Sequence, residues 1–181
     1  MSYEIVFTSQ LTLYTSHLTL HTSHLKKMIT IYTDGAAIGN PGAGGYGIVM
    51  TFEKFRKEIS QGYKHTTNNR MELLAVIVAL ETLKNDNSLA TVYSDSKYVI
   101  DAINKKWVFG WLKKGFVGKK NEDLWRRFLN INKKHSVTYT WVKGHAGNPE
   151  NERCDVLATT AAKNKNKSEL LVDEFYENLT E

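Results

Sequence analysis

The sequence predicts an α/β fold with a five-stranded mixed sheet and helices packed on it, and three observations support this prediction. Three β-rich segments follow one another at 29–33, 46–52 and 55–63, which favours an antiparallel meander. The segments after residue 68 then alternate between helical and strand-like patterns, as parallel strands joined by helices do. With 41% hydrophobic and 24% charged residues in a chain of 181, the composition suits one domain with a core.

Each later element follows from its spacing or its flanking residues. The first helix is predicted because Leu73, Ile77 and Leu80 recur on one helical face. The last begins where Asn148 provides a cap and Pro149 a first helical residue. The expected helices cover 69–84, 96–104, 121–134 and 148–162. The remaining expected strands are 91–94 and 137–141, and the glycine-rich stretch 34–45 is expected to be a turn.

We expect three regions along the chain. Residues 1–27 contain the repeats FTSQLTL, YTSHLTL and HTSHLKK and are expected to be dispensable and poorly ordered. Residues 28–163 then form the functional domain, beginning at Met28. Residues 164–181 form an acidic tail without a strong structural signal, which either shields a basic segment or is simply solvated.

That basic segment runs from Lys97 to Lys134 and has eleven Lys or Arg residues against three acids. Charge alone leaves two interpretations, a solvated face or a surface for a polyanion. The sequence has no apolar run of ~18 residues that would span a membrane and no signal-peptide pattern. The single cysteine, Cys154, excludes an intramolecular disulfide and is expected to be buried. A lone thiol fits a reducing compartment, and we expect a cytoplasmic protein.

Two short strands are each expected to stop at an aspartate, Asp34 and Asp95. If the strands are parallel neighbours, both carboxylates emerge at one edge of the sheet, where like charges need a cation or a proton between them. Either residue alone could instead cap the following turn. Glu72 fits a capping box with Asn69 as well as a metal ligand. Asp155 fits an exposed acid in the N-terminal half of a helix equally well.

His145 lies between glycines in the segment WVKGHAGN, where a mobile loop is expected. A histidine there is either an idle surface residue or a proton shuttle, since its pKa lies near neutrality.

Taken together, five segments resemble ribonuclease H of the bacterial type-1 family. They are YTDGA at 32–36, GNPGAGGYG at 39–47, TTNNRMEL at 66–73, YSDSKYV at 93–99 and WVKGHAGNPENERCD at 141–155. The resemblance implies a ribonuclease-H-like fold in which the first three strands are antiparallel and helices cover both faces. It also implies an endonuclease that hydrolyses the RNA strand of an RNA–DNA hybrid and leaves 5′-phosphate and 3′-hydroxyl ends.

The resemblance assigns Asp34, Glu72, Asp95 and Asp155 to the metal centre and His145 to the catalytic loop. Hard oxygen ligands point to Mg²⁺, with Mn²⁺ as an alternative. Two ions about 4 Å apart would flank the scissile phosphate. Asp34 is expected to bridge both ions, with Glu72 and Asp95 on one and Asp155 on the other.

The resemblance also implies contacts to the hybrid, and we expect a monomer. The backbone of Gly35 and the side chains of Asn68 and Glu72 would lie near the RNA strand, and Lys97 stands where relatives often carry an amide. Trp107 would lie against DNA sugars, and the basic run 105–120 resembles the family's basic protrusion. Trp111 and Trp125 are expected to serve mainly as core. The expected contacts to DNA phosphates are Asn40, Thr67 and Asn69.

Three other functions are alternatives to this one. A transposase-like or resolvase-like nuclease acting on DNA is disfavoured by TTNNRMEL, which matches the RNA-reading positions. A binding module with a dead site is disfavoured because all four acids are present. A domain of a reverse transcriptase is disfavoured because no polymerase sequence precedes Met28.

Overall fold

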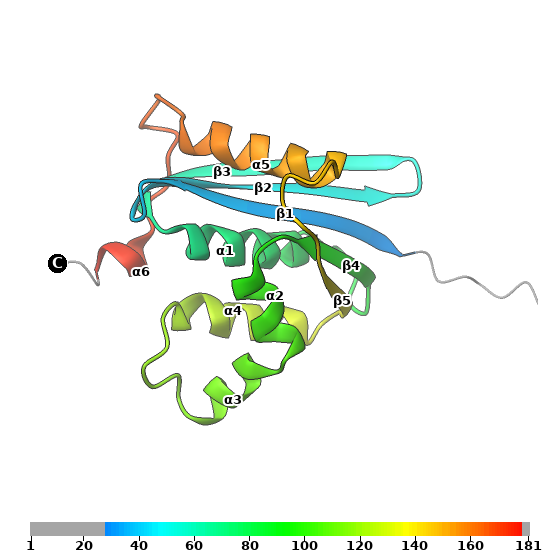
Figure 1. Cartoon of the computed structure of the whole chain (residues 1–181). Helices are drawn as coiled ribbons and strands as arrows, with labels where there is room; N and C mark the ends of the chain where they lie inside the picture. The colour runs from blue at the N-terminus through cyan, green and yellow to red at the C-terminus, as the bar shows by residue number, and fades with distance from the viewer. Residues whose placement is uncertain (1–27, 179–181) are drawn as a thin grey trace, which may run out of the picture.

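The computed structural model describes residues 28–178, which form a five-stranded sheet with helices on both faces (Figure 1). The strands are β1 (Ile29–Ile38), β2 (Gly42–Phe52), β3 (Phe55–Thr66), β4 (Leu89–Ser94) and β5 (Ser136–Trp141). Their order across the sheet is β3-β2-β1-β4-β5. The first three strands are antiparallel, whereas β4 pairs in parallel with both β1 and β5. The predicted mixed sheet is confirmed.

The helices are α1 (Asn68–Glu81), α2 (Lys97–Asn104), α3 (Trp107–Lys113), α4 (Glu122–Asn132), α5 (Pro149–Ala162) and α6 (Glu174–Glu177). Helix α5 covers one face of the sheet, and α1 and α4 lie on the other (Figure 1). The predicted cap of α5 is confirmed, because the Asn148 side chain accepts hydrogen bonds from the backbone N–H groups of Glu150 and Asn151. None of the helices within 28–178 has the length and apolarity needed to cross a membrane.

The core lies between the sheet and α1. Ile31, Ile48 and Val92 from three different strands are fully buried, and so are Leu73 and Ile77 of α1. Burial of one such side chain stabilises the fold by about 1.5–3 kcal/mol. Helix α1 is buried on more than one side because α4 packs on it from below (Figure 1).

The glycine-rich stretch 34–45 is not a single turn, so that prediction is wrong. Strand β1 continues through Asp34 to Ile38, β2 begins at Gly42, and only the residues between them form the turn. The glycines of β2 serve close packing instead of a turn. A Cβ on Gly45 would lie 2.7 Å from the Ala158 carbonyl oxygen of α5, and one on Gly47 would lie 2.2 Å from the Cys154 carbonyl oxygen.

The tail has no strong structural signal in the sequence, but residues 164–178 pack against the domain. Leu171 forms a parallel bridge with Tyr63 of β3, Leu170 is buried, and α6 follows. Helix α3 was not predicted as a separate element. The expectation for residues 1–27 falls outside the part of the chain that the structure describes.

Candidate active site

Asp34 and Asp95 lie side by side because β1 and β4 pair in parallel, with Thr33 opposite Ser94. Asp95 directly follows the end of β4, as predicted, but Asp34 lies inside β1. The Asp34 carboxylate is 9% exposed, and its Oδ1 accepts a hydrogen bond of 2.7 Å from the backbone N–H of Gly35. The backbone pairing of β1 with β4 therefore sets the positions of both aspartates.

Glu72 reaches this edge because α1 touches β1 at a glycine. A Cβ on Gly35 would lie 2.2 Å from the Glu72 backbone nitrogen, so the strand tolerates no side chain there. The Glu72 carboxylate accepts hydrogen bonds from Asn68 Nδ2 at 2.9 Å and from Ser96 Oγ at 2.5 Å. The capping-box alternative fails, because the N-cap of α1 is Thr67 and not Asn69.

Asp155 arrives from the opposite face of the sheet. Gly47 pairs with Asp34 in the register of β1 and β2, and α5 packs directly on Gly47 at Cys154. Asp155 follows Cys154 on α5 and is close enough to raise the pKa of Asp34. Cys154 itself is fully buried, as expected, and its burial raises the pKa of the thiol.

The four carboxylates act on one another electrostatically. Burial and, after it, the charge of Asp95 raise the pKa of Asp34 to about 8, with smaller contributions from Asp155 and Glu72 and an opposing one from the N–H of Gly35. Burial also raises the pKa of Glu72 to about 6, and the hydrogen bonds from Ser96 and Asn68 oppose this rise. A cation at this edge would offset the same repulsion.

The donor set suits a divalent metal ion with a preference for oxygen, because it consists of carboxylates. Within residues 28–178, no three His, Cys, Asp or Glu side chains are arranged to hold a single ion. The expected three-carboxylate shell of Asp34, Glu72 and Asp95 therefore stays a prediction. Pairs of carboxylates suit ions whose remaining ligands are water and substrate phosphate oxygens.

The loop that carries His145 passes over Asp95. A Cβ on Gly144 would lie 2.5 Å from Asp95 Oδ2, and Trp141 Nε1 donates to the backbone oxygen of Asp95 at 3.0 Å. His145 is exposed and has a left-handed backbone with φ of 50°. The structure thus places the predicted histidine next to Gly144, on the loop that borders the carboxylates.

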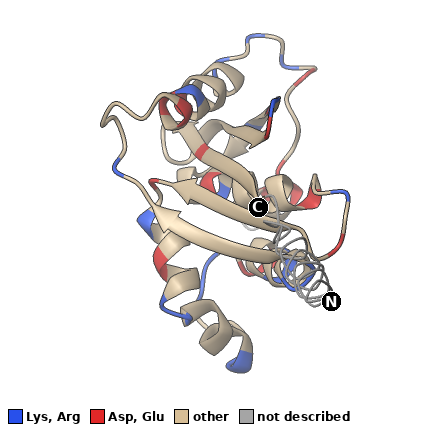
Figure 2. Cartoon of the chain, turned by 90° about the vertical axis from the view of Figure 1, so that its right-hand side faces the viewer, with Lys and Arg blue, Asp and Glu red and all other residues tan. Residues whose placement is uncertain are grey.

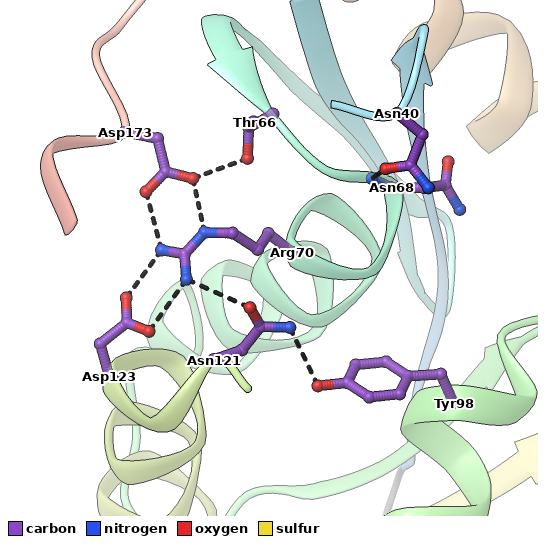
Figure 3. Close-up of polar contacts among 8 residues, drawn as sticks. All are labelled: Asn40, Thr66, Asn68, Arg70, Tyr98, Asn121, Asp123 and Asp173. Carbon is purple, nitrogen blue, oxygen red and sulfur yellow. Dashed lines mark hydrogen bonds and ion pairs between the residues drawn. The ribbon is translucent and has the colours of Figure 1, made fainter. Parts of the chain in front are cut away.

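The residues expected to hold DNA gather in two adjoining clefts. Asn40, Thr67 and Asn69 line a cleft of about 620 Å³. Asn69 also lines a second cleft, of about 330 Å³, together with Trp107, which is 47% exposed. The backbone N–H of Asn68 donates to Asn40 Oδ1 at 3.1 Å (Figure 3). The predicted phosphate contacts therefore form one group.

Lys97 lies apart from this group. Its ammonium lies 5.0 Å from the centre of the Trp141 ring, a cation–π contact beside Asp95. The rest of the basic segment lies on α3, on α4 and in the connections around them, toward the lower end of the molecule (Figure 2). There Trp125 is fully buried and Trp111 packs against its edge, with ring centroids 5.7 Å apart, so both belong to the core as expected.

Sequence reasoning missed two residues that hold the carboxylates. Ser96 donates to Glu72 and also caps α2, accepting a hydrogen bond from the Val99 N–H. Asn151 is 2% exposed, and its Nδ2 donates to Asp95 Oδ2 at 3.2 Å. A serine at a helix start signals a cap but not a contact to a distant acid, and Asn151 has no local signal.

Comparisons with known proteins agree with this geometry. The model of the RNase H family matches residues 26–163. Ribonuclease H of Desulforamulus reducens is 55% identical over 145 residues, covering 77% of this chain and 91% of the relative. Ribonuclease H of Lachnoclostridium phytofermentans is 54% identical over 149 residues, covering 76% of this chain and 94% of the relative.

Solved structures give the same result. The structure of LC9-RNase H1, a type 1 RNase H with the type 2 active-site motif, superposes with a TM-score of 0.69 at 30% identity, covering 86% of this chain and 81% of that one. LC11-RNase H1, solved in complex with an RNA/DNA hybrid, superposes with a TM-score of 0.55 at 28% identity, covering 74% of this chain and 96% of that one. The chain therefore belongs to the ribonuclease H family of metal-dependent endoribonucleases, in its bacterial type-1 branch.

Proposed function

We propose that this protein hydrolyses the RNA strand of RNA–DNA hybrids at internal positions and leaves 5′-phosphate and 3′-hydroxyl ends. The observation that carries the proposal is that Asp34 of β1 has three carboxylates close enough to raise its pKa, those of Asp95, Asp155 and Glu72. Membership of the ribonuclease H family supports it. So does the likeness to LC11-RNase H1, which was solved with an RNA/DNA hybrid.

We propose Mg²⁺ as the metal, with Mn²⁺ as a substitute, because all four donors are hard carboxylate oxygens. Asp34 would bridge two ions, with Glu72 and Asp95 on one and Asp155 on the other. Bound there, the ions would supply activation of the attacking water and stabilisation of the leaving 3′-oxygen. Asp34 must lose its proton to bind metal, so its raised pKa makes metal binding compete with a proton.

The neighbouring side chains keep the carboxylates in place. Ser96 and Asn68 each bind one oxygen of Glu72, and Asn151 binds one oxygen of Asp95. Such partners fix the orientation of a ligand and are worth much of its affinity for metal. His145, on the loop beside Asp95, would assist proton transfer or product release.

The two strands of the hybrid would contact two different sets of residues near the start of α1. The Gly35 backbone, Asn68 and Glu72 would read the 2′-hydroxyls of the RNA strand in its wide minor groove. Asn40, Thr67 and Asn69 would hold DNA phosphates. Trp107 would lie against DNA sugars, and Lys97 would add a positive charge near the RNA. We propose that the enzyme acts as a monomer in the cytoplasm, where a single buried thiol stays reduced.

The proposal is tested with an end-labelled RNA–DNA hybrid, beside RNA–RNA and DNA–DNA duplexes, in Mg²⁺ and in EDTA. We expect cleavage of the RNA strand of the hybrid alone, lost in EDTA and lost in Asp34→Asn. Cleavage of the DNA duplex, or near-normal turnover by Asp34→Asn with a native circular dichroism spectrum, would contradict it.

A further inference from the structure

The segment that follows α5 is hydrogen-bonded to β3, the outermost strand on one side of the sheet. The Lys64 N–H donates to the Leu171 carbonyl at 2.9 Å, and the Leu171 N–H donates to the Gly62 carbonyl at 2.9 Å. Leu170, next to it, is 8% exposed. The segment therefore holds to β3 as a short extra strand, and this contact sets the position of α6 at the end of the sheet where α1 begins (Figure 1).

A buried arginine fixes the segment further. Arg70, in the first turn of α1, is 1% exposed. Its guanidinium donates to both oxygens of Asp173, at 2.6 and 2.7 Å, and to both oxygens of Asp123, at 2.9 and 2.7 Å (Figure 3). Thr66 Oγ1 donates to the same Asp173 carboxylate at 2.6 Å. One cation thus joins the C-terminal segment, α1 and α4.

The same guanidinium lies against two aromatic rings of α6. Its carbon is 5.4 Å from the centre of the Phe175 ring and 6.0 Å from that of Tyr176. His65 packs against the Tyr176 ring from β3, with ring centroids 5.4 Å apart. Phe175 nevertheless remains 41% exposed. The two rings are therefore held in place, and part of the Phe175 surface is open to a ligand.

These rings form a wall of the larger cleft described above. Its other lining residues come from the turn after β1, the start of α1, the loop before α4 and the first residue of α4. They are Asn40, Pro41, Thr67, Asn69, Lys119, Lys120, Asn121 and Glu122. The cleft adjoins the one that holds Trp107, since both are lined by Asn69, Lys119, Lys120 and Asn121. A path lined by amides, lysines and aromatic rings thus runs from Trp107 to Phe175.

The charges along this path favour an anion. Lys119 and Lys120 contribute two positive charges. The one carboxylate in the lining, Glu122, is paired with Arg126 at 2.7 Å, and Asp173 behind the rings is paired with Arg70. Lysines beside exposed aromatic rings suit the backbone of a nucleic-acid strand, because the lysines attract its phosphates and the rings can pack against the apolar faces of its sugars.

We propose that the C-terminal segment is part of the substrate-binding surface: Phe175 and Tyr176 pack against a deoxyribose of the DNA strand of the hybrid, next to the phosphate held by Asn40, Thr67 and Asn69. This inference rests on the proposed function. The DNA strand is the occupant because the residues proposed to hold DNA line the cleft. Those proposed to read RNA, Gly35, Asn68 and Glu72, lie outside its lining.

The first test is binding of a fluorescent hybrid, measured in EDTA so that no strand is cut. Phe175→Ala should raise the Kd about fivefold, because the apolar contact of the ring with the sugar is lost. Phe175→Trp should restore wild-type binding, whereas Phe175→Leu should not. The matched control is Phe55→Ala, which removes a ring that is 63% exposed at the opposite end of the sheet (Figure 1). It should bind as the wild type does.

The second test identifies the strand. A photoreactive phenylalanine derivative at position 175 of the full chain should crosslink to a labelled DNA strand of the hybrid. Crosslinks to the RNA strand alone, or a Kd in Phe175→Ala equal to that of the wild type with the fold intact, would overturn the inference.

Cleavage by the wild-type protein in Mg²⁺ separates this inference from the proposed function. If the wild type cuts the hybrid but position 175 neither crosslinks nor affects binding, only the further inference fails. If position 175 crosslinks to DNA but no hybrid is cut, only the proposed function fails.

Discussion

At Asp34, burial and the neighbouring carboxylates favour the protonated form, while metal binding requires the charged one. The carboxyl has its ordinary pKa of 3.8 when the chain unfolds and a pKa of about 8 in the fold. Between these values the folded state binds more protons than the unfolded state. The free energy of unfolding therefore falls as pH rises through this window. In the absence of metal, the Asp34 carboxyl therefore lowers the free energy of unfolding more at pH 8 than at pH 4.

We expect Asp34→Asn to raise the free energy of unfolding by about 2 kcal/mol at pH 8 in EDTA and to flatten its pH dependence between pH 4 and 8. Urea denaturation at several pH values measures this. Asp86→Asn, in an exposed loop, is the control and should leave the profile unchanged. A wild-type profile that rises with pH across this window would contradict the electrostatic account. Added Mg²⁺ should stabilise the wild type more than the variant.

Ser96 has two roles that one substitution can separate. Its hydroxyl donates to Glu72 and accepts from the Val99 N–H at the start of α2. Ser96→Ala should lower stability by about 1 kcal/mol through loss of the cap. It should also raise the Mg²⁺ concentration for half-maximal cleavage about tenfold through the loosened Glu72.

Ser96→Thr keeps the hydroxyl and should restore both properties. Ser88→Ala, which removes a hydrogen bond to the Asn85 carbonyl in a loop, is the control for metal dependence. An unchanged Mg²⁺ requirement in Ser96→Ala would mean that Ser96 serves the helix alone.

At this scale, the sequence predicts residues whose chemistry is visible in their own segment. Asp34, Asp95 and His145 stand out because a strand or a glycine pair surrounds them. Ser96 and Asn151 could not be predicted, because their partners lie 24 and 56 residues away in the chain. Only the pairing of β1 with β4 and the packing of α5 bring them together with those partners.

Among the elements, the glycines of β2 decide how closely α5 approaches the sheet. A Cβ on Gly47 would lie 2.2 Å from the Cys154 carbonyl oxygen, which belongs to the backbone and cannot turn aside. Gly47→Ala should therefore displace α5, lower the free energy of unfolding by about 3 kcal/mol and reduce cleavage, since Asp155 moves with the helix.

Gly110→Ala in α3 is the matched control, because a Cβ there meets nothing within 4 Å. It should raise the free energy of unfolding by about 0.5–1 kcal/mol, since alanine favours a helix. Urea denaturation measures the free energy of unfolding of both variants. A Gly47→Ala variant as stable as the wild type would show that α5 shifts without strain.

The same glycines explain the main error of prediction at this scale. In sequence, 34–45 has the composition of a turn, and nothing local distinguishes a glycine needed for φ above zero from one needed for close packing. Alternating and periodic segments were predicted well, since burial on one face produces the pattern directly. Helix α3 has only seven residues, and its aromatic and basic side chains show no clear period.

Across the whole molecule, the region matched by the family ends at residue 163, yet the structure continues as a packed segment to residue 178. This could not be predicted from the sequence, because an acidic composition suggests solvation and the partner of Asp173 lies 103 residues earlier, at Arg70. The acids of this segment are thus partly structural, and the fold closes by joining its end to the start of α1.

The final prediction compares a buried ion pair with an exposed one. In Arg70–Asp173 the two side chains are 2% and 9% exposed, whereas in Lys105–Asp101 they are 54% and 36% exposed. Asp173→Ala should lower the free energy of unfolding by about 3 kcal/mol, because it leaves part of a buried guanidinium unpaired. Asp101→Ala should cost less than about 1 kcal/mol.

Replacing the buried cation as well separates pairing from packing. Arg70→Met combined with Asp173→Ala should be more stable than Asp173→Ala alone, since no unpaired guanidinium then remains buried. Thermal and urea denaturation of the three variants measures this. If Asp173→Ala and Asp101→Ala lowered the free energy of unfolding equally, the C-terminal segment would contribute little to the stability of the fold. Deletion of residues 1–27 should preserve both stability and cleavage. The chain would then depend on its C-terminal end for folding but not on its N-terminal repeats.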